Sequence, residues 1–203
     1  MTDFNTAARS WDNNSIHAQR SLAIAKNMLE RIEVLPEMKA LEFGAGTGIL
    51  SFMLADRFSS ITMMDSASEM VAVMQEKVEV SPTKNLKPVL FDLTKQSYET
   101  EAFDCVFSQM ALHHVEDTQG ILNRFFELLQ KGGCLAVADL FSEDGSFHGA
   151  GFDGHNGFDA IALEAKMKKA GFLNVQTETC FTIRKMTAEG SKDFPIFLMI
   201  ARK

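Results

Sequence analysis

The sequence predicts an α/β domain whose central strands run parallel, on two observations. Short apolar segments alternate along the chain with longer segments in which apolar residues recur at helical spacing. The first apolar strand, 39–43, also leads directly into a glycine-rich turn, 44–48, and then into a helical pattern. A strand, a turn and a helix in this order form a candidate nucleotide site.

The N-terminal half begins with a polar stretch, 1–13, that contains the only tryptophan, Trp11. Apolar residues from Ile16 to Ile32 then recur with a near-helical period, and Pro36 closes that segment. Strands are expected over 39–43, 60–64 and 87–91, and helices over 15–34, 49–58 and 68–80.

The C-terminal half continues the alternation. The run Lys131-Gly132-Gly133 is expected to break a helix, and the strand after it, 134–140, is apolar throughout, as in a central parallel strand. The least regular segment, 141–158, is a long glycine-rich loop with four phenylalanines. Strands are expected over 103–108, 134–140, 174–183 and 194–201, and helices over 119–130 and 159–170.

Length and composition favour one soluble globular domain over 1–203, since 46% of the residues are hydrophobic and 23% are charged. A net charge of −7 argues against a nucleic-acid-binding surface. The N-terminus lacks the pattern of a secretory leader, and the apolar runs are too short to span a bilayer. The three cysteines lack metal-ligand spacing, so we expect reduced core thiols, no metal site and a cytoplasmic location.

The glycine turn carries the strongest functional signal. Gly44, Gly46 and Gly48 occupy alternate positions, where glycine permits positive φ and close approach of a ligand to the main chain. The free N–H groups of the following helix would face the same turn. The alternative is a tight turn without a ligand. A dinucleotide fingerprint would need its third glycine at position 49, where the chain has Ile49.

Together with Glu42, the turn reads E-x-G-x-G-x-G and resembles the first motif of class I S-adenosylmethionine-dependent methyltransferases of the small-molecule, methyltransferase-11/12-like type. The stretch from Phe103 to Asp117, FDCVFSQMALHHVED, resembles the strand-four motif of that family, although Lys131 stands where many members have proline. The resemblance implies a doubly wound, Rossmann-like sheet of seven strands in the order 3-2-1-4-5-7-6. The last strand would be antiparallel, and helices would cover both faces.

The resemblance also implies S-adenosylmethionine as cofactor and S-adenosylhomocysteine as product. Asp65 follows the second strand and would accept hydrogen bonds from the ribose hydroxyls, the alternative being a helix cap. Asp92 would accept from the adenine amino group, the alternative being a solvated turn aspartate. The other expected cofactor contacts are Glu42, Gly44, Ala45, Gly46, Gly48, Ser66, Met70, Leu93, Ser108, Gln109 and Trp11.

The acceptor side is less specific. His113 and His114 are the nearest candidates for a catalytic base, because histidine titrates near neutral pH, but each has a structural alternative. The loop 141–158 is interpreted as a substrate loop in which His148, Phe152 and His155 bind the acceptor, the alternative being a mobile connection. The segment 1–35 is interpreted as a helical lid that places Trp11 over the cofactor, or else as ordinary packing.

The sequence therefore predicts in-line methyl transfer to a small-molecule acceptor by a monomer or homodimer without nucleic-acid or membrane partners. Two alternatives stay open: an oxidoreductase of the NAD(P)-binding Rossmann type, and a non-catalytic module that binds S-adenosylmethionine. The acceptor atom, whether oxygen, nitrogen, sulfur or carbon, is not specified.

Overall fold

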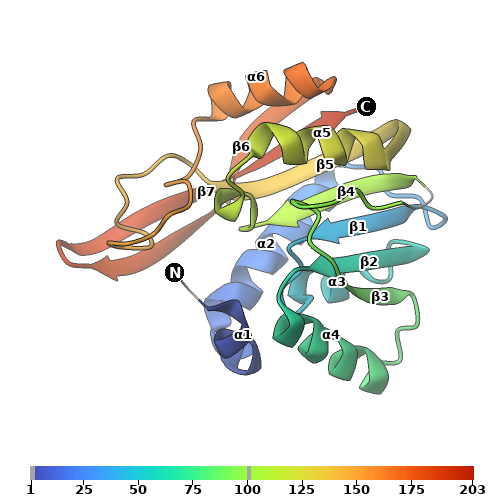
Figure 1. Ribbon diagram of the computed structural model, residues 1–203, viewed down its shortest axis with the longest axis horizontal. Helices are drawn as coiled ribbons and strands as arrows, with labels where there is room; N and C mark the ends of the chain where they lie inside the picture. Colours follow the sequence, from blue (N-terminus) through green and yellow to red (C-terminus); the bar gives the residue numbers. More distant parts are fainter. Residues whose placement is uncertain (1–2, 100–101) are drawn as a thin grey trace.

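In the computed structural model, which describes residues 3–99 and 102–203, seven strands form one sheet of order β3-β2-β1-β4-β5-β7-β6 (Figure 1). Strands β1 to β5 pair in parallel, whereas β7 is antiparallel to both of its neighbours. Sequence and structure agree on the strand order and on the antiparallel last strand. The strands are β1 Lys39–Phe43, β2 Ser60–Asp65, β3 Leu86–Leu90, β4 Phe103–Gln109, β5 Leu129–Leu140, β6 Leu173–Thr187 and β7 Gly190–Arg202.

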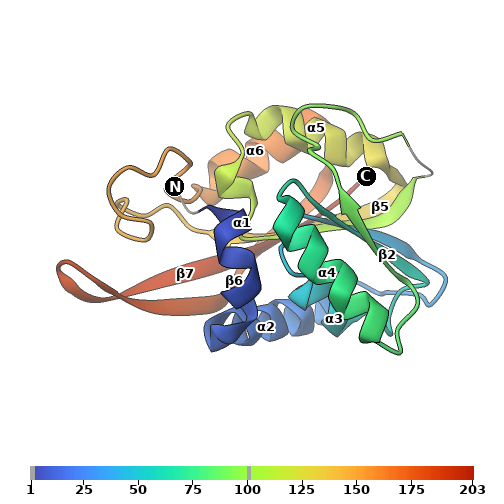
Figure 2. The same ribbon diagram turned by 60° about the horizontal axis from the view of Figure 1, so that its bottom comes forward.

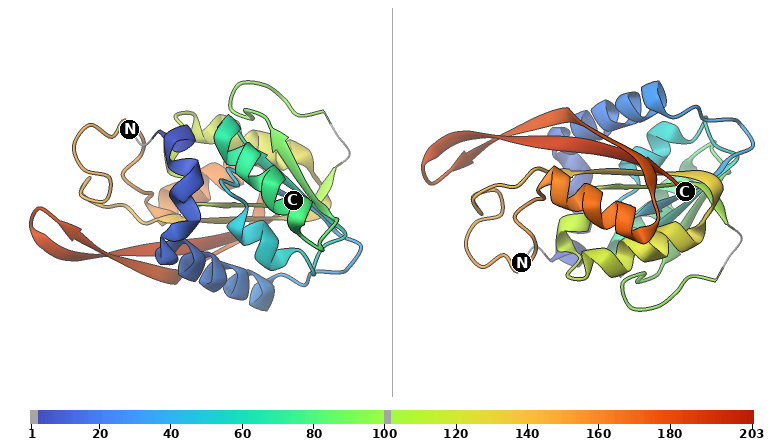
Figure 3. Two further views of the ribbon diagram at one scale, coloured as in Figure 1. Left: turned by 90° about the horizontal axis from the view of Figure 1, so that it is seen from below. Right: turned by 90° about the horizontal axis from the view of Figure 1, so that it is seen from above.

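Helices cover both faces of the sheet, as Figure 3 shows from two sides. The helices α2, α3 and α4 bury their apolar side chains in the core on one face, and α5 and α6 do so on the other. The helical elements are α1 Phe4–Ala7, η1 Ala8–Asn13, α2 Ser15–Arg31, α3 Ile49–Leu54, α4 Ser68–Val80, η2 Leu112–His114, α5 Thr118–Leu128 and α6 Ala160–Ala170. Among the described residues, none of these helices has the length and apolar character needed to cross a bilayer.

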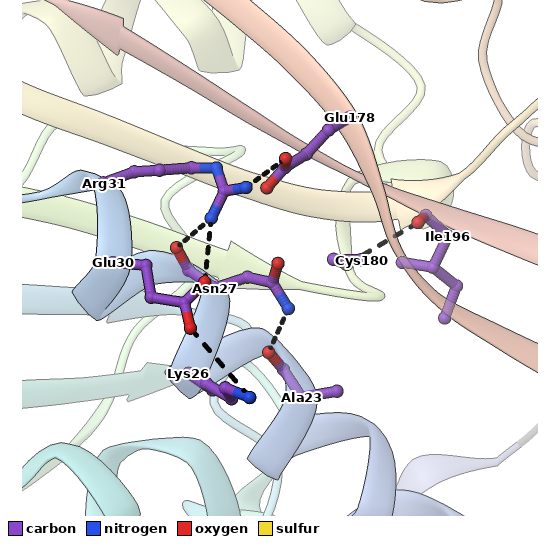
Figure 4. Close-up of polar contacts among 8 residues, drawn as sticks. All are labelled: Ala23, Lys26, Asn27, Glu30, Arg31, Glu178, Cys180 and Ile196. Carbon is purple, nitrogen blue, oxygen red and sulfur yellow. Dashed lines mark hydrogen bonds and ion pairs between the residues drawn. The ribbon is translucent and has the colours of Figure 1, made fainter.

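The helix α2 is fixed to the far edge of the sheet by polar contacts near its C-terminus (Figure 4). Arg31 pairs with Glu178 of β6 and also reaches the carbonyl oxygen of Asn27 at 3.2 Å. Within the helix, Lys26 lies 4.0 Å from Glu30, one turn further along. The contacts of Arg31 with Asn27 and of Lys26 with Glu30 lie within α2, so the pair Arg31–Glu178 is the one of these that joins the helix to the sheet.

The end of α5 differs from the prediction. The helix stops at Leu128, and β5 begins at Leu129, before the Lys131-Gly132-Gly133 run that was expected to break the helix. At this boundary Lys203 Nζ donates to the carbonyl oxygens of Phe126 and Leu129 at 2.6 Å each, and Leu129 pairs with Phe103 of β4. Both contacts come from residues distant in the sequence, so no local pattern indicates the boundary. The helix α3 is also shorter than predicted and ends at Leu54.

The last two strands are longer than the predicted 174–183 and 194–201. Their pairing continues to Thr187 opposite Gly190, so the β6–β7 hairpin projects beyond the rest of the sheet (Figure 1). Its outer part is stabilised by cross-strand charge rather than by a core, since Arg184 Nε donates to Asp193 Oδ1 at 2.7 Å. An apolar pattern could not reveal strands that lack a buried face.

Candidate active site

The glycine turn has the backbone conformation that its composition predicts. Gly44, Gly46 and Gly48 have φ of +66°, +58° and +81°, a region that other residues rarely adopt. A Cβ placed on Gly44 would lie 2.4 Å from Cβ of Ala111, so β1 packs directly against the chain that leads from β4 into η2. By contrast, the nearest atom to a Cβ on Gly46 is Nε1 of Trp11, at 3.9 Å.

Glu42 lies beneath this turn and is fully buried. Its Oε2 accepts hydrogen bonds from the backbone N–H of Ser51, at 3.2 Å, and from the Ser51 hydroxyl, which ties β1 to α3. Burial raises the pKa of Glu42 to about 8, so the carboxyl keeps its proton at neutral pH. The other oxygen, Oε1, has no hydrogen-bond partner among the described residues. Its contact with the cofactor stays a prediction.

Asp65 ends β2 beside the turn. Its Oδ2 accepts from the N–H of Gly46 at 2.7 Å and its Oδ1 from the N–H of Ala67 at 2.9 Å. Burial raises the pKa of Asp65 above its ordinary value. Each carboxylate oxygen has a second lone pair, so two further hydrogen bonds can be accepted. Asp65 thus braces the loop between β2 and α4 without capping the helix, whose N-cap is Ala67, and it retains capacity for ribose hydroxyls.

The residues expected to contact adenine are less available to a ligand than Asp65. Asp92 accepts from both the backbone N–H, at 3.0 Å, and the hydroxyl of Thr94, and it pairs with Lys95 at 2.7 Å. These contacts match the alternative of a turn aspartate. Met70 and Leu93 are core residues, whereas Ser66 is exposed. The assignment of these four residues to the cofactor stays a prediction.

The strand β4 ends at the same edge of the sheet. Ser108 is buried, and its hydroxyl has no hydrogen-bond partner in the described ranges 3–99 and 102–203. Gln109 Oε1 accepts from the hydroxyl of Ser21 at 2.9 Å, which connects the site to α2. The residue directly before Ser21, Arg20, is buried near Asp139, and burial lowers the pKa of its guanidinium to about 10. Neither Ser21 nor Arg20 departs from an ordinary helical pattern, so the sequence does not indicate their place beside the site.

The N-terminal segment, 3–14, lies over the glycine turn. Trp11 stacks on His17 with ring centroids 4.2 Å apart, and its indole nitrogen faces Gly46 as described above. Asp12 accepts from the hydroxyl of Thr47 and from Lys77 Nζ, the latter at 2.8 Å. Although the sequence of this stretch is polar, the structure forms the helical elements α1 and η1 here, with Asp3 as the N-terminal cap, and the lid role of 1–35 stays a prediction.

These features fit S-adenosylmethionine, the cofactor that the sequence implies. The glycines leave the backbone of the turn accessible to a bound ligand, and Asp65 has free acceptor capacity beside it. Two buried polar atoms without a partner among the described residues, Glu42 Oε1 and Ser108 Oγ, lie on the two strands that flank the turn.

A second group of side chains gathers beyond η2. His113 is buried, with its side chain 1% exposed, and its Nδ1 lies 2.6 Å from Oδ1 of Asp139 in β5. The backbone N–H of His113 donates to the other oxygen of Asp139 at 3.1 Å. One carboxylate therefore fixes both the ring and the main chain of His113. Asp139 was missed, although a lone acid inside an otherwise apolar strand was a usable signal.

His114 and His148 complete this group. The ring of His114 lies 4.2 Å from that of His113 and 5.6 Å from that of His148, centroid to centroid. Phe152 stacks on His148 at 3.9 Å, with an angle of 17° between the rings. Phe4 of α1 approaches His114 edge-on at 5.1 Å. The N-terminal segment and the segment 141–159 thus meet at His114, and Figure 2 shows both at the same end of the molecule.

The remaining loop residues serve the fold. His155 Nε2 lies 3.0 Å from the carbonyl oxygen of Val115 and 3.2 Å from the hydroxyl of Thr118, so it holds the loop to the start of α5. Its role toward the acceptor stays a prediction. Phe158 is part of the core, and Phe147 packs on Phe194 of β7. Of the four phenylalanines in the loop, Phe152 contacts His113, His114 and His148, and Phe147 approaches His148 edge-on at 4.8 Å.

Comparisons with known proteins find methyltransferases. The family model described as "Methyltransferase domain" matches residues 41–137. An uncharacterized methyltransferase of Schizosaccharomyces pombe is 30% identical over 156 residues, which cover 68% of this chain and 55% of that protein. Phosphoethanolamine N-methyltransferase 1 of Arabidopsis thaliana is 26% identical and is covered over 33% of its length, against 77% of this chain. The chain thus spans between a third and about half of these relatives.

Solved structures share the fold. Phosphoethanolamine N-methyltransferase 2 of Haemonchus contortus, in complex with S-adenosyl-L-methionine, has a TM-score of 0.73 at 15% identity and matches 100% of this chain and 60% of that one. The [4+2]-cyclase SpnF has a TM-score of 0.72 at 16% identity and matches 89% of this chain and 79% of that one. The same fold therefore occurs in proteins with different chemistries. For this reason the family is assigned from the sequence motifs and not from the fold alone. On the evidence of its motifs, its sheet and its relatives, the chain belongs to the class I S-adenosylmethionine-dependent methyltransferase family.

Proposed function

We propose that this protein transfers a methyl group from S-adenosylmethionine to a small-molecule acceptor held near His114, His148 and Phe152. The observation that carries the proposal is the contact between the two halves of the site. Ala111 packs against Gly44 of the glycine turn, and three residues later His114 meets both the N-terminal segment and the segment 141–159. An acceptor at His114 is therefore close to a cofactor on the turn.

The contribution of the chain is mainly positioning. The cofactor supplies a methyl group on a positively charged sulfur, which is itself reactive toward nucleophiles. Holding two reactants close and aligned can lower a barrier by about 7–11 kcal/mol. Phe4, Trp11 and Phe152 supply an apolar cover that limits water at the site.

The surroundings of Phe152 favour an acceptor of modest size. A hollow of about 410 Å³ lies between the segment 141–159 and the turn of the β6–β7 hairpin, and Phe152 forms part of its wall. Pockets for small molecules commonly have volumes of about 300–1,000 Å³. Because Phe152 also stacks on His148, the hollow and the histidines share a wall.

The test combines binding with turnover. S-adenosylhomocysteine at a hundredfold excess over its dissociation constant should stabilise the protein by about 2.7 kcal/mol, whereas nicotinamide dinucleotides should not. Labelled S-adenosylmethionine should then transfer methyl to a member of a metabolite panel that includes phosphoethanolamine. The small-molecule assignment would be overturned if the protein binds S-adenosylhomocysteine but transfers methyl to no small molecule. It would also be overturned if the methyl group is transferred to an acyl carrier protein instead. Stabilisation by the dinucleotide alone would favour the oxidoreductase alternative.

The lid interpretation has its own test. We expect Trp11 fluorescence to change when S-adenosylhomocysteine binds, because the indole lies over Gly46. Limited proteolysis should become slower in both 3–14 and 141–159, since both segments meet at His114. Equal cleavage rates with and without the ligand would leave Trp11 as an ordinary packing residue.

A further inference from the structure

Three histidines that are separated in sequence converge in the acceptor half of the site. One ring nitrogen from each of His113, His114 and His148 lies within 4.8 Å of the others. They come from η2 and from the segment that follows β5, so two stretches of the chain build the group. Neutral imidazole nitrogen is a common ligand of zinc and of other first-row transition metals.

His113 has the hydrogen bonding of a metal ligand. Its Nδ1 is engaged by Asp139, at 2.6 Å, which leaves Nε2 as the nitrogen with a free lone pair. That Nε2 is buried and has no hydrogen-bond partner among the described residues. Ligating histidines in proteins almost always donate their other ring N–H to a carboxylate or carbonyl group, which fixes the tautomer and the orientation. Asp139 occupies that position here.

His148 presents a second nitrogen of this kind. Its Nε2 is buried and has no hydrogen-bond partner among the described residues. A metal ligand needs an unprotonated ring nitrogen with a free lone pair.

From this geometry we propose that His113, His114 and His148 bind one divalent transition-metal ion, with Zn²⁺ as the type ion. Ligand nitrogens in a tetrahedral zinc site with bonds of about 2.0–2.1 Å are about 3.4 Å apart, so the observed limit of 4.8 Å requires a contraction of about 1.4 Å. His148 precedes Gly149, at φ +84°, in an irregular segment that can supply this movement.

The metal would leave a position for the acceptor. Three protein ligands are characteristic of zinc sites that keep a fourth position open for water or substrate. Resting on the proposed function, we infer an acceptor with a thiol or hydroxyl group. Its proton would pass to solvent more readily once the oxygen or sulfur is coordinated.

The first experiment measures metal binding without turnover. The chelator-treated protein is titrated with Zn²⁺ by calorimetry, and with Co²⁺ while the visible absorption of tetrahedral cobalt is followed. We expect one ion per chain and a loss of affinity of about a hundredfold or more in His114→Ala and in His148→Ala. Asp139→Asn should lose about 10–100-fold, because Asp139 orients a ligand without being one.

The matched control is His155→Ala, which removes a histidine from the same segment. His155 Nε2 is engaged by Val115 and Thr118, so this variant should bind Zn²⁺ as tightly as the wild type. S-adenosylhomocysteine binding, measured on every variant, reports whether the domain is folded and the cofactor half intact. Absence of a cobalt spectrum in folded wild-type protein, or equal losses in His155→Ala and His148→Ala, would overturn the site.

A second experiment separates the metal from the methyl transfer. If Zn²⁺ binds but removal of the ion leaves the transfer rate unchanged, the role in acceptor activation is wrong while the site stands. If the protein binds Zn²⁺ through these histidines and transfers no methyl group, the proposed function fails independently of the site.

Discussion

The two halves of the site are built in different ways. The cofactor half, formed by the glycine turn and Asp65, depends on main-chain conformation and on residues close together in sequence. The acceptor half combines Phe4, His114 and Phe152 from three distant segments, which meet through ring contacts. The cofactor half should therefore be sensitive to the addition of a single methyl group, whereas the phenylalanine rings of the acceptor half should tolerate replacement by other apolar side chains. The predictions below test this contrast.

The largest effect is expected at Gly44. In Gly44→Ala the added Cβ would lie 2.4 Å from Ala111, at φ +66°, so we expect the free energy of unfolding to fall by about 2–4 kcal/mol and cofactor binding to be lost. Gly46→Ala is the matched control, because its Cβ meets only Trp11, at 3.9 Å. It should cost about 1–2 kcal/mol of stability and still block the ligand. Denaturant melts and calorimetry with S-adenosylhomocysteine measure both, and equal stabilities would contradict the packing argument.

At Asp65 the effect should fall on affinity. Loss of charge-assisted hydrogen bonds costs about 1.5–3 kcal/mol, so Asp65→Ala should weaken S-adenosylhomocysteine binding by about 10–150-fold. Asp92→Ala is expected to lose less, because Asp92 is already engaged by Thr94 and Lys95. Calorimetry measures the S-adenosylhomocysteine affinity of both variants. An unchanged affinity in Asp65→Ala would show that Asp65 does not bind the ribose hydroxyls.

Glu42 allows a test by pH. Its pKa is about 8 in the folded protein against an ordinary value of 4.5, so the folded state binds the proton more tightly than the unfolded state does. The stability contribution is therefore full below about pH 4.5 and is lost as the pH rises toward 8. Glu42→Gln should flatten this dependence, with a relative gain on the order of 1–3 kcal/mol at about pH 8 compared with about pH 5. Parallel pH profiles of variant and wild type in denaturant melts would show that Glu42 is ionised when folded.

The smallest effect is expected in the acceptor half. Phe152→Leu removes a ring stacked on His148, a contact typically worth about 0.5–1.5 kcal/mol, so methyl transfer should fall by about 2–10-fold. Affinity for S-adenosylhomocysteine should stay within about twofold of wild type, since Phe152 belongs to the other half. Phe194→Leu, which alters a buried packing contact with Phe147, should lower the melting temperature instead. A large loss of cofactor affinity in Phe152→Leu would show that the two halves of the site are not independent.

This contrast also explains how far the sequence could be interpreted. The glycine turn was recognisable because Gly44, Gly46 and Gly48 each occupy a position with positive φ, a requirement that few other residues meet. The strand order followed from the family resemblance that these glycines and the His113-His114 pair carry. In both cases residues close together in the sequence indicate the structure, because the requirement that they meet is itself local.

The acceptor half was only partly visible in the sequence, because its constraints are not local. The sequence suggested His148 and Phe152, but the contact of Phe4 with His114 joins residues 110 positions apart, and nothing near Phe4 indicates it. Asp139 appeared as one residue of an apolar strand, and its bond to His113 depends on the pairing of β4 with β5. The end of α5 differs from the prediction for a similar reason, because Lys203 and Phe103 contact the chain there from distant positions in the sequence.

The β6–β7 hairpin has a consequence for how specificity could change. Lys185 and Lys192 reach from its outer part to Phe147 and Ser146, so the hairpin supports the segment that carries His148. Inserting two residues in each strand would move the turn by about 7 Å and keep every side chain on its original side. The length of the hairpin therefore sets how far its support for the neighbouring segment extends. That length can change by two residues per strand at a time without disturbing the glycine turn at the other end of the site.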